Sequence, residues 1–230
     1  NAGTWGAYST IANVAPASTT IYKVNVRCSS ETSCNSSDAT GVQVTVRPSF
    51  TAGAMNTTGE TICYSGDPVE IGNTTDASGG DGSITYKWQY STDVGWTSPQ
   101  DIASSNSTTY NPPANLTENR WYRRQAKDGT CNTSWETSTG VWAVTVRTEF
   151  SAGAINTTSE TICYNGDPAN ITSATAASGG DASITYKWQY SADVGWSSPQ
   201  DIASSNSATY NPPANLTENR WYRRLAQDGT

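Results

Sequence analysis

The five cysteines are the most reactive side chains in this sequence, and their positions suggest a disulfide framework. Cys63 precedes and Cys131 follows the most strongly patterned part of the chain, Cys163 repeats the position of Cys63, and Cys28 and Cys34 flank a short polar turn. Paired cysteines in an acidic chain rich in Ser and Thr are typical of an oxidising, extracellular compartment. We therefore predict Cys63–Cys131 and Cys28–Cys34 disulfides, with Cys163 unpaired because its partner is expected just after the last residue. The alternative is free thiols that pack as small hydrophobic groups.

Histidine is absent from the sequence, which constrains the chemistry open to it. Histidine is the commonest general base, the commonest metal ligand, and the partner of Ser and Cys nucleophiles. The remaining enzymatic route is a hydrolase that uses carboxylates, for example Asp81 and Asp101. Because catalysis rarely needs serial copies of one domain, we expect that the protein is not an enzyme.

Acidic turns recur along the chain and raise the question of a metal. Gly66-Asp67-Pro68 and Gly79-Gly80-Asp81 return as residues 166–168 and 179–181. Asp and Gly satisfy tight turns through side-chain hydrogen bonds and positive φ angles. Their oxygens would also suit calcium, but no D-x-D-x-D cluster is present. We expect turns, with calcium as the alternative and no other cofactor.

Several tryptophans do not fit a buried position and could bind a ligand. Trp96 and Trp121 return as Trp196 and Trp221. Amphipathic aromatic side chains on a surface can stack on sugar rings. The alternative is that they cover the edge of a sheet or pack between repeats. Nine tryptophans are too many for one binding site in so small a core, so we favour packing.

Charge and hydropathy exclude several classes of partner. The net charge of −7 argues against nucleic acid and against an anionic membrane surface. No apolar run approaches the roughly 20 residues that span a bilayer, so we expect no membrane insertion in this segment.

A near-exact internal repeat organises the chain. The segment 83–91, SITYKWQYS, returns unchanged at 183–191, and 69 of the 87 positions in 44–130 match those in 144–230. We therefore divide the chain into a first unit (1–47), the C-terminal half of a divergent repeat; a second unit (48–147), a complete repeat; and a third unit (148–230), which lacks its last strand. Because both ends fall inside a repeat, we predict that the sequence is a window on a longer array.

Alternating side chains predict strands rather than helices. In 83–91 the apolar residues Ile84, Tyr86, Trp88 and Tyr90 occupy every second position. Seven or eight short strands divided by Gly and Pro turns in about 100 residues predict an all-β fold of tandem immunoglobulin-like antiparallel β-sandwiches. The expected structural core contains one set of aromatic residues and its repeat copies: Trp88, Trp188, Tyr122, Tyr222 and Trp142.

Several motifs together carry a family resemblance. They are residues 61–68 (TICYSGDP), 77–91 (ASGGDGSITYKWQYS), 109–124 (TYNPPANLTENRWYRR), 128–131 (DGTC) and 144–146 (VTV). The chain resembles the PKD-like, immunoglobulin-like repeats of giant bacterial cell-surface adhesins, especially SprB-like gliding adhesins exported by the type IX secretion system. It departs from true PKD domains in that Gln89-Tyr90 follows Trp88 in place of their Trp-Asp-Phe-Gly-Asp-Gly run. The resemblance implies a secreted, surface-anchored filament of many repeats.

Repetition and resemblance lead to one functional expectation. Near-identical repeats in series form a quasi-one-dimensional rod whose length scales with copy number. We expect an extracellular mechanical spacer and adhesive stalk on the cell surface, with a role in gliding motility. Its partners would be neighbouring repeats, surface polysaccharide or other surface proteins. The alternative is an array of carbohydrate-binding modules on a secreted enzyme.

Overall fold

The fold is all-β, as the sequence predicts. A computed structural model describes residues 15–23 and 41–229, and these residues form strands, turns and bends but no helix. The described part of the chain accordingly has no helix long and apolar enough to cross a membrane. The predicted Cys28–Cys34 disulfide lies outside the described residues.

The second unit is a two-layered sandwich. Its main sheet has the order β4-β10-β8-β6-β7, with β9 also paired to β8, and a separate β3–β5 pair lies in the second layer. All of these pairs are antiparallel except β4 with β10, which is parallel. The strands are β3 (Ala54–Met55), β4 (Glu60–Ile62), β5 (Asn73–Thr75), β6 (Thr85–Ser91), β7 (Gln100–Asp101), β8 (Arg120–Lys127), β9 (Glu136–Thr137) and β10 (Trp142–Val146).

The other two units repeat parts of this arrangement. In the third unit the sheet order is β14-β13-β15, and β11 pairs with β12. In the first unit β1 pairs with β2 in the register that β8 and β10 use, so that Tyr22 faces Val42 as Tyr122 faces Trp142. The strands are β1 (Thr20–Tyr22), β2 (Val42–Val44), β11 (Ala154–Ile155), β12 (Ser173–Thr175), β13 (Thr185–Ser191), β14 (Gln200–Asp201) and β15 (Trp221–Gln227).

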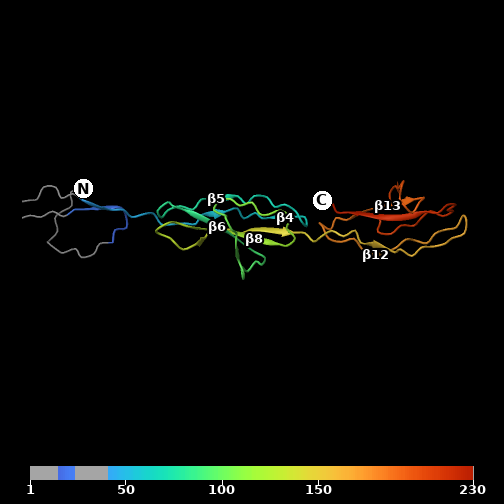
Figure 1. Cartoon of the computed structure of the whole chain (residues 1–230), viewed down its shortest axis with the longest axis horizontal. Helices are drawn as coiled ribbons and strands as arrows, with labels where there is room; N and C mark the ends of the chain where they lie inside the picture. Colours follow the sequence, from blue (N-terminus) through green and yellow to red (C-terminus); the bar gives the residue numbers. More distant parts are fainter. Residues whose placement is uncertain (1–14, 24–40, 230) are drawn as a thin grey trace, which may run out of the picture.

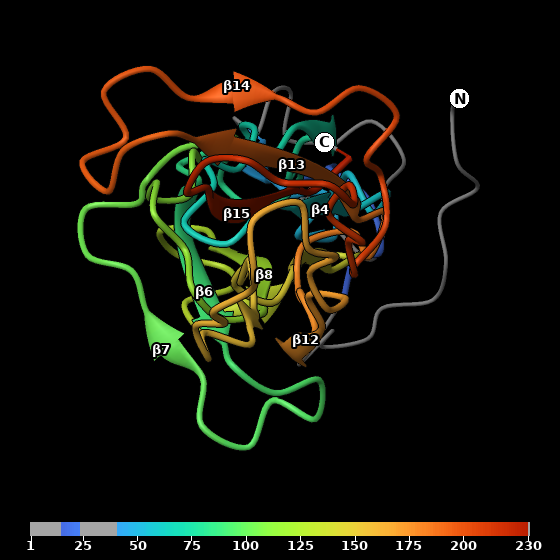
Figure 2. The same cartoon turned by 90° about the vertical axis from the view of Figure 1, so that its right-hand side faces the viewer.

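The units follow one another along a single long axis (Figure 1). The long strands β6, β8 and β13 run close to the direction of that axis. Seen along the axis, the equivalent strands β7 and β14 project in different directions (Figure 2). Successive units are therefore rotated relative to one another about the long axis of the array.

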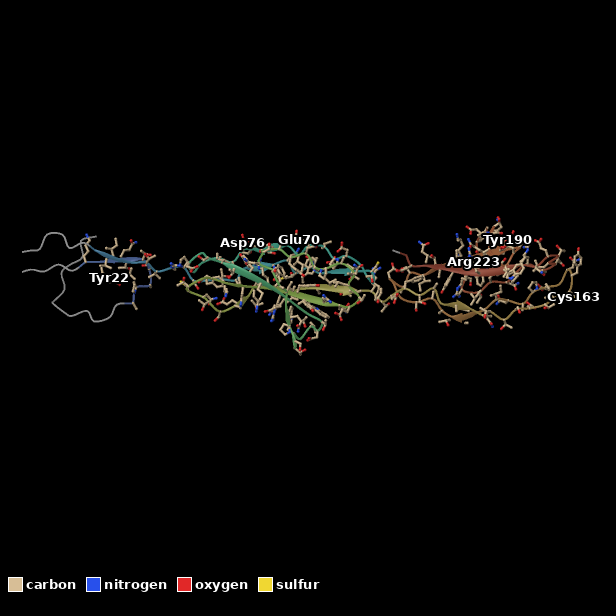
Figure 3. All side chains as sticks on the ribbon, in the orientation of Figure 1. Tyr22, Glu70, Asp76, Cys163, Tyr190 and Arg223 are labelled. Atoms are coloured by element: carbon tan, nitrogen blue, oxygen red, sulfur yellow. The ribbon has the colours of Figure 1, made fainter. Side chains whose placement is uncertain are left out.

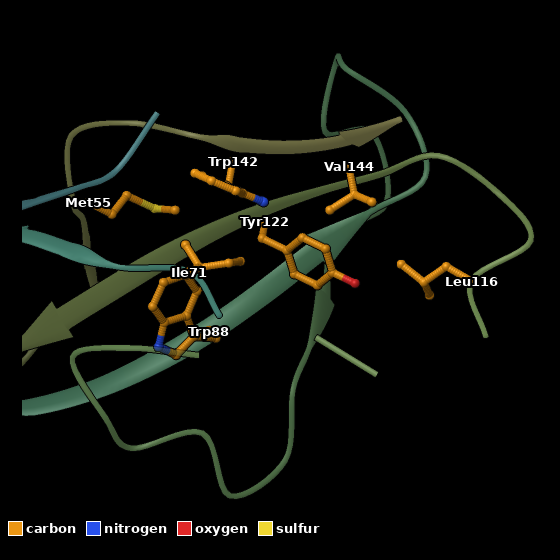
Figure 4. Packing of buried hydrophobic residues seen from close by; sticks show 7 residues of the cluster. All are labelled: Met55, Ile71, Trp88, Leu116, Tyr122, Trp142 and Val144. Atoms are coloured by element: carbon orange, nitrogen blue, oxygen red, sulfur yellow. The ribbon is translucent and has the colours of Figure 1, made fainter. Parts of the chain in front are cut away.

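Aromatic side chains of the long strands fill the core of the second unit (Figure 4). Trp88 and Tyr122 are fully buried and Trp142 is 5% exposed. The Trp88 indole N–H donates to the Ser107 carbonyl at 2.9 Å, and its ring stacks on Tyr110 with centroids 5.6 Å apart. The whole buried cluster is Met55, Ile71, Trp88, Leu116, Tyr122, Trp142 and Val144.

The third unit has the same aromatic core but an open side. Trp188 is fully buried, whereas Tyr222 is only half-buried. In the second unit β10 covers this position with Trp142 and Val144. Among the described residues no strand takes that place in the third unit, and a groove lined by Ile155, Ile162, Ile171, Leu216 and Tyr222, among others, remains.

A buried arginine joins the two layers of the second unit. Arg124 has no exposed surface, and its guanidinium donates to the Asn73 amide oxygen at 2.6 Å, to the Ser138 hydroxyl at 3.1 Å and to several backbone carbonyls. It also lies over the Tyr86 ring, 5.0 Å from the centroid. Burial lowers the pKa of Arg124. The carbonyl acceptors are those of Thr108, Thr75, Ala54 and Ala52, at 2.9, 3.1, 3.3 and 3.5 Å.

Candidate functional site

The junction between the second and third units is held by contacts on both sides of the linker. The Arg147 amide donates to the Ile62 carbonyl at 2.9 Å, which ties the end of β10 to β4. The Arg147 guanidinium lies 3.6 Å from the Asp181 carboxylate of the next unit. The Gly180 amide donates to the Thr148 carbonyl at 2.9 Å. One residue, Arg147, therefore belongs to the sheet of one unit and pairs with the other.

The preceding junction has the same construction. Arg47 lies 3.7 Å from Asp81, and the Gly80 amide donates to the Pro48 carbonyl at 2.9 Å. Pro48-Ser49 is replaced by Thr148-Glu149 at the next junction. This change keeps the contact, because the acceptor is a backbone carbonyl that any residue supplies. The array therefore uses one junction geometry twice.

The double glycine in the acidic turn is required by this close approach. Gly79 has φ +84°, and a Cβ at this position would meet the Ser49 carbonyl oxygen at 2.0 Å. Gly80 has φ +58°, where a Cβ would overlap the Asp128 carboxylate. Positive φ angles and backbone contact favour glycine. The turn is thus shaped to receive the linker of the preceding unit.

Asp81 completes the turn that the sequence suggested. Its carboxylate accepts from the Ser83 amide at 2.7 Å and the Gly129 amide at 3.3 Å, and it pairs with Arg47. The described residues contain no group of three or more metal-ligating side chains. Hydrogen bonds to the turn and the junction ion pair account for this aspartate, and calcium binding stays an untested alternative.

Local hydrogen bonds shift the ionisation of the junction carboxylates. The pKa of Asp181 is lowered to about 2, first by its hydrogen bond with the Asp228 side chain, then by the Ser183 amide, with a smaller contribution from Arg147. Burial alone would raise the pKa of Asp128, but the amides of residues 130–132 donate to it and lower the pKa overall. Both carboxylates are therefore ionised at neutral pH.

The low pKa of Asp181 predicts acid sensitivity of the third unit. An aspartate titrates near pH 3.9 in an unfolded chain, so the stability that Asp181 contributes is present above about pH 4 and is lost as the pH falls toward 2. We expect the urea midpoint of the third unit to fall more between pH 5 and pH 2.5 in the wild type than in Asp181→Asn. Equal falls in the two proteins would contradict this assignment, because all other carboxylates are shared.

The predicted Cys63–Cys131 disulfide is not formed, and both thiols are free and exposed. β4, which precedes Cys63, pairs with the β10 residues that lie beside Arg120 at the start of β8. Cys131 follows the other end of β8. Eight residues of strand span about 26 Å, whereas a disulfide needs Cα atoms within about 7 Å. The prediction was therefore wrong for a bond within one unit; Cys163 is also free.

An outer strip of polar and aromatic side chains covers the solvent face of the long strands; we define it as Lys87, Gln89, Trp96, Asp101 and Arg123. Arg123 lies over the Trp96 ring, 4.3 Å from its centroid, and donates to the Gln89 oxygen at 2.8 Å. Gln89 donates to Asp101 at 2.5 Å, and Lys87 pairs with the same carboxylate at 3.1 Å. Hydrogen bonds from Gln89 and Lys87 lower the pKa of Asp101.

The third unit repeats the outer strip almost without change. Arg223 lies 4.3 Å from the Trp196 ring centroid, and Lys187 pairs with Asp201 at 2.9 Å. Gln189 connects the two halves, accepting from Arg223 at 2.8 Å and donating to Asp201 at 2.6 Å. The strip is therefore a property of the unit.

The four tryptophans proposed for glycan stacking lie on this outer face. On β8, Trp121 faces Ser91 and alternates with the buried Tyr122, so it points to the same side as Arg123 and Trp96. Trp96 and Trp121 are half-buried, as are Trp196 and Trp221. Arg123 covers one face of the Trp96 ring, so that face is already packed against the protein.

The two aspartates considered for hydrolysis do not form a pair. Asp101 lies opposite Gln89 in the middle of β6, whereas Asp81 precedes the start of β6 at Thr85. Four residues of strand between Thr85 and Gln89 span about 13 Å. Paired glycosidase carboxylates are roughly 5 to 9.5 Å apart. Asp81 and Asp101 therefore lack the spacing of an acid–base pair.

Comparison with protein families places both later units in one family. A family model described as a domain of unknown function (DUF8696) matches residues 51–148 and 151–230. The chain belongs to this family. Each DUF8696 copy carries the junction aspartate, the outer strip and the aromatic core described above. No match was found among curated proteins.

Proposed function

We propose that this chain is an extracellular segment of a large filamentous cell-surface adhesin, in which the DUF8696 units act as a mechanical spacer and adhesive stalk. The observation that carries the proposal is the repeated junction, in which Arg47–Asp81 and Arg147–Asp181 make the same contact one unit apart. A fixed junction between near-identical units gives a linear array whose length grows with copy number.

The strand arrangement suits a load along the array. Each unit is entered at one end, near Pro48, and left at the other, after Val146, while the long strands run between these ends (Figure 1). Tension along the axis therefore acts on β4 and β10 parallel to the strands, and the hydrogen bonds between them resist together. In this geometry the hydrogen bonds between β4 and β10 must break together, and the unit resists stretching more than it would if they broke one at a time.

The finer parts of the proposal follow the family resemblance. We assign the sandwiches to the immunoglobulin-like, PKD-like class and the protein to the cell surface, with a role in gliding motility. The six-stranded main sheet, the separate β3–β5 pair and the buried Trp88 support the fold assignment. Repetition of units whose outer strip is mostly polar supports a stalk exposed to solvent.

The stalk function can be tested with displayed arrays. Copies of residues 48–147 would be anchored to a cell surface in series of two, four and eight, each ending in an epitope tag. The tag height should rise linearly, by at least about 25 Å per unit, the length of β8 alone. A height that grows with the square root of copy number would indicate freely jointed units and would contradict the proposal.

Carbohydrate binding is the second candidate, and one observation favours it. Trp96 and Trp121 share the outer face with the polar side chains of the outer strip. Glycan-array binding by the wild-type chain that disappears in Trp96→Ala, with unchanged thermal stability, would favour a binding module. If the chain bound no glycan, the stalk would be the only one of the two proposals still supported.

A further inference from the structure

The two cysteines of the second unit, Cys63 and Cys131, lie at opposite ends of it, and the units are joined end to end. We propose that the cysteine equivalent to Cys63 in one unit forms a disulfide with the cysteine equivalent to Cys131 in the next. This inter-unit disulfide would run alongside the linker at every junction. The inference rests on the proposed function, because it requires units in series.

The Cys131 end of the second unit faces the unit before it. Cys131 lines a surface pocket together with Thr45, Arg47, Pro48 and Phe50. Thr45 and Arg47 follow β2, the last strand of the first unit. The thiol therefore lies beside the strand end of the preceding unit and is exposed there.

At the next junction, the same strand end lies beside Cys63. Thr145 and Arg147 are the counterparts of Thr45 and Arg47; Thr145 is directly opposite Thr61, and the Arg147 amide donates to the Ile62 carbonyl. Cys63 is the next residue after Ile62. The strand end of one unit therefore lies beside Cys131 of the next unit at the first junction and beside Cys63 of its own unit at the second. Because the two junctions share one geometry, each strand end is expected to lie beside both kinds of cysteine.

The C-terminal end of the third unit, which corresponds to the Cys131 end of the second unit, lies at the junction between the two. In Figure 1 the C-terminus of the third unit lies at the junction, next to β4 of the second unit. Gly229 corresponds to Gly129, two residues before Cys131. Asp228 bonds the Asp181 amide at 3.0 Å, and Asp181 pairs with Arg147. The end of the third unit is thus connected through Asp181 to Arg147, whose amide donates to Ile62, the residue before Cys63.

Cys163 occupies the opposite position and has no such neighbour. Figure 3 shows it at the far end of the third unit, away from the junction. It is free and exposed, as Cys63 and Cys131 are. All three described thiols therefore lie at unit ends, where a partner would come from an adjacent unit.

The bond forms by thiol–disulfide exchange. A thiolate of one unit attacks the disulfide of an oxidant such as glutathione disulfide, which gives a mixed disulfide and one released thiol. The thiolate of the next unit displaces the second thiol. The two protein thiols lose two protons and two electrons, and the oxidant becomes two reduced thiols.

The test uses the full chain extended by a copy of residues 131–147 after Thr230, which supplies the third unit with its own cysteine. The protein would be oxidised with glutathione disulfide, alkylated without reductant, and digested with trypsin and a glutamate-specific protease. The second protease is needed because trypsin does not cleave the Arg47–Pro48 bond, whereas cleavage after Glu60 and Glu70 separates Cys63 from Cys28 and Cys34. The monomer should contain a peptide that links Cys63 to the added cysteine, while Cys131 and Cys163 are alkylated. The peptides are distinguishable because Lys127 is replaced by Gln227 in the third unit.

A matched control replaces the added cysteine with serine. Alkylation of Cys63 should then return to completion. A link between Cys63 and Cys131, or complete alkylation of Cys63 in the extended protein, would overturn the inter-unit disulfide. The displayed arrays test the stalk separately, because their height can be measured with reductant present. A height that rises linearly with copy number, together with complete alkylation of Cys63 in the extended protein, would overturn the inter-unit disulfide and leave the proposed function intact.

Discussion

Replacing Arg124 with methionine is expected to destabilise the second unit by about 3–5 kcal/mol, because buried acceptors lose their donor. The guanidinium holds the β3–β5 layer to the main sheet through Asn73 and the carbonyls of Ala54 and Thr75. Methionine fills similar volume but donates no hydrogen bond. The second unit should therefore unfold first in urea, which hydrogen exchange can assign through peptides that contain Gln125 rather than Leu225.

Two matched variants control for this result. Arg123→Met removes the neighbouring arginine, which lies half-buried on the outer strip, and should cost less than about 1 kcal/mol. Arg224→Met removes the equivalent arginine of the third unit, which is half-buried, and should have an intermediate effect. Equal losses in Arg123→Met and Arg124→Met would show that the buried hydrogen bonds do not hold the layers together.

Supplying the missing strand should stabilise the third unit by about 3–5 kcal/mol, the order expected for burying one Trp and two Val side chains less their ordering cost. In the second unit Trp142 and Val144 are buried against Met55, and Val146 packs beside them. The counterpart of Met55, Ile155, lines the open groove. The chain extended by a copy of residues 131–147 should therefore show a higher urea midpoint for the third unit.

The control for the extension keeps its length and changes its apolar face. Serine at the added counterparts of Trp142, Val144 and Val146 should abolish the gain. The second unit, which already contains β10, should be unaffected by either extension. A third unit with the same midpoint before and after extension would mean that the groove does not accept the strand.

Periodicity predicted the core well, because alternation along a strand reports directly which side chains face inward. Tyr86, Trp88 and Tyr90 were expected on one side, and the structure buries Trp88 completely while the two tyrosines are half-buried. On β8, the buried residues are Tyr122, Arg124 and Ala126, as alternation requires. The repeat then carried the same pattern to the third unit.

Long-range geometry was less accessible to sequence reasoning. Alternation gives the face of a residue but not the end of the sandwich at which it lies, so Cys63 and Cys131 could be paired in sequence although they lie at opposite ends. The parallel pairing of β4 with β10 decides this point. Tyr110, which stacks on Trp88, lies outside the named strands and forms only an isolated bridge with Ile71.

The outer strip shows the same limit. Arg123 and Arg124 are adjacent in the sequence, yet their environments differ: Arg123 stacks on Trp96 on the outer face. The other arginine, Arg124, is buried among carbonyls from segments up to 72 residues away. No local pattern reports such acceptors, because they are backbone groups that every residue possesses.

The central claim is that one junction geometry fixes each unit relative to the next. Residual dipolar couplings of the full chain in a weakly aligning medium test it directly, since each unit reports its own alignment. The account predicts alignment tensors of equal magnitude for the second and third units, with a relative orientation that matches the structure, and a loss of this agreement in Arg147→Ala. Tensors of different magnitude in the wild-type chain would show units that move independently, and would contradict a stalk built on a fixed junction.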